Sequence, residues 1–69
     1  MKQLRLNAHL TVFELAVKSG VSIRTINRIE GGKEHMVTGL TAQKLVDALG
    51  ETLGHKINPE EVEGLRIRG

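Results

Sequence analysis

The stretch that decides the fold is TVFELAVKSGVSIRTINRIE, residues 11–30. Thr11 and Glu14 have the spacing of a capping box, in which each side chain satisfies a backbone N–H at the start of a helix. Gly20 is expected to end this first helix, because glycine adopts the left-handed conformation that closes helices. Ser22 is a favoured N-cap, so a second helix is expected to begin there. The stretch therefore predicts two short helices joined by a bend.

The two helices are expected to pack against each other through small and aliphatic side chains. The residues on their inner faces and at the bend are Leu15, Ala16, Val21, Ile26 and Ile29. Ala16 allows the second helix to approach closely, since a bulkier side chain there would overpack the crossing. With these residues in the core, the opposite side of the second helix is expected to face solvent.

That outer stripe carries three polar side chains with hydrogen-bonding capacity and one isoleucine. Its residues are Ile23, Arg24, Asn27 and Arg28. Arginine bonds guanine and asparagine bonds adenine in a bidentate manner, so the stripe is suited to the edges of DNA bases. A solvated helix surface also carries charged residues, and the charges alone leave both interpretations open.

The rest of the chain also has helical rather than strand signals. Helices are expected at residues 2–8, 11–19, 22–30, from 38 to Gly50 or Leu53, and at 58–64. No sustained alternation of apolar and polar residues predicts a strand. We therefore expect an all-α, compact five-helix domain over residues 1–64, followed by a C-terminal tail at 65–69.

Composition limits the function classes. The chain has 69 residues, no cysteine and a formal net charge of +2, which permits binding to a polyanion without arguing for it. The lack of cysteine excludes disulfides and thiolate zinc sites and fits a reducing cytoplasm. The start of the chain has no long apolar run, which argues against a secretory signal or a membrane span. We expect a cytoplasmic, nucleoid-associated protein.

Enzymatic interpretations find little support in the sequence. His9, His35 and His55 lack the spacing of metal ligands. The segment 31–33 is glycine-rich and ends in lysine, but Glu34 follows where a phosphate-binding loop needs serine or threonine. We expect no catalysis, no metal and no cofactor.

Residues 10–33 resemble the helix-turn-helix of the Cro/C1-type (XRE) family of phage repressors and bacterial regulators. The shared features are the Leu-Thr opening, Glu-Leu-Ala, Gly followed by Val-Ser, and the Ile-x-x-Ile-Glu-x-Gly-Lys close. Residues 41–45 and 48–50 are similar to the family's fourth helix, and 58–61 to its fifth. The resemblance covers about residues 2–63 and implies a lambda-repressor-like domain that binds double-stranded DNA.

The resemblance also implies roles for single residues. Base contacts fall on Ile23, Arg24, Asn27 and Arg28, on a helix that lies in the major groove. Phosphate contacts fall on Thr11, Ser22, Thr25 and Lys33. Capping alone is the other interpretation for Thr11 and Ser22, and a solvated side chain is the other interpretation for Lys33.

Three further expectations follow from the same resemblance. Val12 stands where the family often has glutamine, which puts a phosphate contact at that position in doubt. The segment 34–39 is long for a connection between the third and fourth helices, and it is open to DNA, to a partner or to solvent. Arg5 and Glu30 are expected to form a largely buried pair that fixes the first helix against the third.

The same fold also serves protein interaction, as in an antitoxin or anti-repressor. The apolar residues offered for such a partner are Val12, Phe13, Ile23, Met36 and Val37. For DNA binding a homodimer is expected, because one recognition helix contacts few base pairs. It would use the region from Leu53 to Leu65, with or without residues 65–68. Arg66 and Arg68 could instead reach the DNA backbone, or the tail could remain free.

Overall fold

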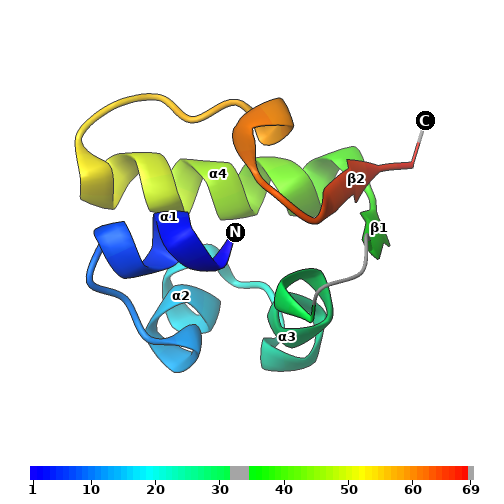
Figure 1. Ribbon diagram of the computed structural model, residues 1–69, viewed down its shortest axis with the longest axis horizontal. Helices are drawn as coiled ribbons and strands as arrows, with labels where there is room; N and C mark the ends of the chain where they lie inside the picture. The colour runs from blue at the N-terminus through cyan, green and yellow to red at the C-terminus, as the bar shows by residue number, and fades with distance from the viewer. Residues whose placement is uncertain (32–34, 69) are drawn as a thin grey trace.

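The computed structural model describes residues 1–31 and 35–68, and over this part of the chain it is mostly helical (Figure 1). Its elements are α1 (Lys2–Asn7), α2 (Val12–Ser19), α3 (Ile23–Glu30), β1 (His35–Val37), α4 (Gly39–Leu53), the 3-10 turn η1 (Pro59–Glu61) and β2 (Leu65–Ile67). In Figure 1, α4 runs across the molecule above α1, α2 and α3. The two strands lie together at the end where α4 begins.

The predicted helix starts are confirmed. In the capping box of α2, the Glu14 N–H donates to Thr11 Oγ1 at 3.0 Å and the Thr11 N–H donates to Glu14 Oε1 at 2.9 Å. Ser22 caps α3 by accepting from the Thr25 N–H at 3.2 Å. Gly20 has φ 75°, the left-handed conformation that ends α2. The bend between the two helices therefore lies where glycine was expected to place it.

Helix α4 continues through Gly50 and ends at Leu53, the later of the two expected ends. Gly50 is needed for close packing, because a Cβ atom there would lie 2.7 Å from the carbonyl oxygen of His55. Gly54, with φ 84°, is the residue that closes the helix. Gly50 thus allows the segment after α4, at His55 and Ile57, to pass close to the helix backbone.

The core is aliphatic and centres on α4. The fully buried large side chains are Leu15, Ile26, Ile29, Leu45, Val46 and Leu49. The predicted inner faces of α2 and α3 are confirmed: Leu15, Val21, Ile26 and Ile29 are buried, and Ala16 packs half-buried against the same cluster. The α2–α3 pair therefore rests on α4 by one face and leaves the other free.

The expectation of a fifth helix at 58–64 is wrong. The predicted cap at Asn58 forms, since the Asn58 N–H donates to Glu61 Oε2 at 2.7 Å. Pro59–Glu61, however, make only one 3-10 turn. Val62 is extended at φ −93° and ψ 109° and is buried in the core. Burial of Val62, and then of Leu65, draws the chain out of the helix after a single turn.

The two strands were not predicted. They pair in parallel, with His35 opposite Leu65, Met36 opposite Arg66 and Val37 opposite Ile67. Residues 65–67, expected as part of a tail, are therefore a strand whose first side chain is buried. Three residues are too few to show the alternation that identifies strands, and the two partners lie far apart in sequence.

The structure brings Arg5 and Glu30 together. Arg5 Nε and Nη2 donate to the two carboxylate oxygens of Glu30 at 2.8 and 2.9 Å, and Nη1 donates to the Leu10 carbonyl at 2.8 Å. Each side chain of the pair is 9% exposed. The hydrogen bond with Glu30 raises the pKa of Arg5 above its ordinary value. The pair joins α1 to the end of α3.

Replacing one member of this pair should destabilise the domain strongly. Arg5→Met leaves the Glu30 carboxylate buried without a cation, which costs about 3–5 kcal/mol of unfolding free energy. The double variant Arg5→Met with Glu30→Met removes both charges and should recover much of the loss. Urea unfolding of the three proteins measures the effect. If Arg5→Met unfolds at the same urea concentration as the parent, the pair does not hold α1 to α3.

Two glycines with the same backbone conformation should differ in their tolerance of alanine. Gly54 (φ 84°) has open space around it, whereas a Cβ atom at Gly64 (φ 85°) would lie 2.5 Å from the Ile29 carbonyl oxygen. Gly54→Ala should lose about 1–2 kcal/mol from the left-handed conformation alone. Gly64→Ala should lose clearly more, because the backbone at the end of α3 must also move. Equal losses in urea unfolding would contradict the close packing of Gly64 on α3.

Candidate nucleic-acid interface

The expected base-contacting residues lie together on the outer face of α3. Ile26 and Ile29 are buried and fix which side of the helix faces the core. At about 100° per residue, positions 24, 27 and 28 fall on the opposite side, and position 23 falls on its flank. All four are exposed: Ile23, Arg24, Asn27 and Arg28. Their grouping follows from the apolar spacing of α3.

The electrostatics of this face depend on where its nearest carboxylate points. Glu30 closes α3, yet its side chain turns to Arg5 and away from solvent. The ion pairs Arg5–Glu30 and Lys18–Glu51 form away from this stripe, and among the described residues no carboxylate pairs with Arg24 or Arg28. The arginines of the outer stripe therefore keep their charge available to an anionic ligand.

The hydroxyl groups expected at phosphates also serve as caps. Thr11 Oγ1 accepts the Glu14 N–H, which leaves its own hydrogen available to donate. Ser22 Oγ and Thr25 Oγ1 lie 2.9 Å apart in a bond to which only one hydroxyl hydrogen is committed. One donor of this pair therefore remains, so capping and phosphate binding are compatible at Thr11 and at the Ser22–Thr25 pair.

Val12 and Lys33 were expected to bear on the phosphate contacts at the edges of this interface, and the structure describes only Val12. Val12, which replaces the family's glutamine, is half-buried and packs against the core. The N–H groups of the first turn of α2, where Val12 lies, have no acceptor within the helix. Lys33 and Glu34 lie outside the described residues.

The exposed apolar residues differ from those expected. Phe13 (64%), Ile23 (42%) and Met36 (53%) are exposed, as the protein-interaction alternative requires. Val37 is 7% exposed, so its assignment to the surface is wrong, because it belongs to the core cluster. Leu6, Val17 and Leu40 are also exposed, which was not predicted, and so is Ile67 in the segment expected as a tail. The exposure of Val17 could have been predicted from its spacing, because it lies one helical turn after Phe13 on α2.

The described residues include no cluster of three or more histidine, cysteine, aspartate or glutamate side chains placed to hold a metal ion. In the same part of the chain, no helix has the length and apolar character needed to cross a bilayer.

Comparison with known proteins gives a family match. A family model described as "Helix-turn-helix" matches residues 1–55, which contain α1, α2, α3, β1 and α4. No curated protein and no solved structure matches the chain. The match covers most of the chain, including the capped α2–α3 pair and the Arg5–Glu30 contact. The chain therefore belongs to the Cro/C1-type (XRE) helix-turn-helix family of DNA-binding transcriptional regulators.

Proposed function

We propose that the domain reads duplex DNA in the major groove with α3 and acts as a repressor-like regulator of transcription rather than as an enzyme. The observation that carries this proposal is the outer stripe of α3, where Arg24 and Arg28 are exposed and form no ion pair with any carboxylate that the structure describes. The major groove is about 12 Å wide and admits an α-helix. A stripe that combines arginine, asparagine and an aliphatic residue matches the chemistry of base edges.

Within this proposal, each residue of the stripe has a distinct task. Arg24 and Arg28 bond guanine, and Ile23 contacts a thymine methyl group. Asn27 bonds adenine or a neighbouring phosphate. The phosphate backbone is held at Thr11, at the Ser22–Thr25 hydroxyl pair and at Lys33, which supplies affinity without sequence information.

The proposed regulator is a homodimer. Helix α3 has eight residues and presents four side chains outward, which is too few to specify a site of useful length. Two copies on half-sites roughly 34 Å apart, one turn of DNA, double the number of base pairs read.

A second candidate function is the binding of another protein through α2. Phe13 and Val17 lie one helical turn apart and are 64% and 68% exposed. They form an apolar strip on a helix whose inner face is already used by the core. Complex formation that survives high salt would favour this function, whereas DNA binding weakens steeply as salt rises.

The DNA proposal predicts a specific loss on removing the two arginines. Selection from a randomised duplex pool should recover a sequence motif with the parent chain and lose it with Arg24→Ala/Arg28→Ala. Each arginine should contribute about 1–3 kcal/mol of discrimination against the wrong base. The slope of log affinity against log salt should also become shallower in the double variant.

The matched control removes two exposed lysines elsewhere, Lys44→Ala with Lys56→Ala, and changes the net charge equally. It should keep the selected motif. A folded parent that enriches no motif and shows no salt-sensitive duplex binding would contradict the proposal. If the arginine variant still selects the same motif, residues other than Arg24 and Arg28 contact the bases.

A further inference from the structure

One residue of the outer stripe is apolar. Ile23 is 42% exposed, and among the described residues it belongs neither to the core cluster nor to the side chains packed against that cluster. It stands directly beside the exposed Arg24. A single exposed apolar residue is ordinary on a protein surface, so what Ile23 does depends on where α3 places it.

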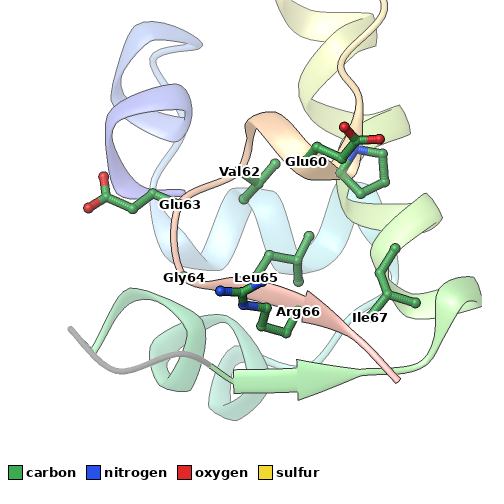
Figure 2. Close-up of a pocket in the computed structure, with 8 residues that line it drawn as sticks. Glu60, Val62, Glu63, Gly64, Leu65, Arg66 and Ile67 are labelled. Atoms are coloured by element: carbon green, nitrogen blue, oxygen red, sulfur yellow. The ribbon is translucent and has the colours of Figure 1, made fainter. Parts of the chain in front are cut away.

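A second isoleucine, Ile67, has nearly the same exposure in different surroundings. It is 45% exposed on β2 and lines a groove together with Val62 and Leu65, as Figure 2 shows. Its side chain also lies against the start of α4, since a Cβ atom on Gly39 would be 3.9 Å from Ile67 Cγ2. The domain itself therefore covers part of Ile67, whereas Ile23 stands among the polar residues of the outer stripe.

The cap of α3 fixes the position of Ile23. Ser22 Oγ accepts the Thr25 N–H at 3.2 Å and lies 2.9 Å from Thr25 Oγ1. Ile23 is thereby the first residue of α3. An isoleucine in a helix has one strongly preferred χ1 rotamer, so a contact made there orders little. Ile23 is a stiff apolar group at the end of the helix from which helix-turn-helix proteins contact base edges.

Ile23 and Arg24 can serve only neighbouring base pairs. Successive residues of a helix rise by about 1.5 Å, less than the spacing of about 3.4 Å between base pairs. If Arg24 bonds a guanine, the partner of that guanine is a cytosine, which has no methyl group. A methyl group that Ile23 contacts therefore belongs to the adjoining base pair.

An apolar side chain recognises the methyl group and not the rest of the base. In the major groove, thymine is marked by its C5 methyl group and cytosine by its amino group. 5-Methylcytosine carries a methyl group at the same ring position as thymine. Ile23 has no side-chain hydrogen-bonding group with which to tell the two bases apart. Thymine–guanine and 5-methylcytosine–guanine steps both place this methyl group directly beside a guanine.

We infer that Ile23 and Arg24 together read a pyrimidine–guanine step, and that the C5 methyl group of the pyrimidine controls how tightly the DNA is bound. The inference rests on the proposed function and names a regulation of the same site. Methylation of a cytosine–guanine step strengthens binding, as a thymine at that position does. Burial of one methyl group corresponds to about a fourfold change in affinity per half-site.

Affinity measurements on one duplex in four forms test the inference. The duplex carries the half-site recovered by selection, with its pyrimidine–guanine step written with thymine, uracil, cytosine or 5-methylcytosine. Uracil differs from thymine, and cytosine from 5-methylcytosine, by the C5 methyl group alone. The parent chain should bind the thymine form about fourfold more tightly than the uracil form, and the 5-methylcytosine form about fourfold more tightly than the cytosine form.

Two variants assign the methyl contact to its residue. Ile23→Ala removes the apolar contact and keeps a good helix former in α3, so both affinity ratios should fall to about 1. Ile67→Ala deletes the same atoms at a position of nearly equal exposure on β2 and should keep both ratios. Circular dichroism establishes that each variant is folded. Because each ratio compares two duplexes with one protein, a change in stability or self-association does not alter it.

The outcomes separate this inference from the proposed function. Ratios of 1 in a parent chain that binds its selected motif would overturn the inference and leave the DNA proposal standing, as would a selected motif without a pyrimidine–guanine step. Ratios that persist in Ile23→Ala would also overturn it, because another residue would then contact the methyl group. A folded parent chain without sequence-specific duplex binding would refute the proposed function and this inference together.

Discussion

The ion pair between Arg5 and Glu30 is the contact on which the placement of the outer stripe of α3 depends. It ties α1 to the last residue of α3 through two hydrogen bonds at 2.8 and 2.9 Å. A buried ion pair is weak evidence of net stability, because both charges lose their hydration. The pair instead fixes the end of α3 against α1. It also turns the Glu30 carboxylate, the one carboxylate of α3, toward Arg5 and away from the outer stripe. The Gly64 turn, which packs on the Ile29 carbonyl, holds the same end of α3 from another side.

The rest of the architecture serves the same placement. Helix α4 packs against α2, and the buried side chains of α2, α3 and α4 form one core cluster. The caps at Thr11, Ser22 and Thr38 fix where each of these helices begins. Because Ile26 and Ile29 are buried there, the arginines between and before them must face outward. The C-terminal segment adds strand β2, which pairs with β1 at the end of the molecule next to the start of α4.

Local signals in the sequence were sufficient for the helix-turn-helix, and they failed for the C-terminal segment. Capping residues, glycine and apolar spacing act within a few neighbours, which is why α2, α3 and the outer stripe could be predicted from residues 11–30. The signal at Asn58–Pro59 started a turn, but burial of Val62 and Leu65 stopped it, and burial depends on the whole fold. The strands pair residue 35 with residue 65, a contact that no local pattern contains. Val37 was misplaced for the same reason, since its partner Ile67 lies thirty positions away.

The most direct test of the central claim is a map of the DNA-binding face by amide NMR during titration with a duplex. The account predicts that the largest shifts fall on α3 and on the start of α2, around Thr11, and that they weaken as salt is raised. Strand β2 and the second half of α4 should change little. Shifts confined to the β2 edge, or an absence of shifts on α3 in a folded protein that binds the duplex, would contradict the assignment of α3 as the reading helix.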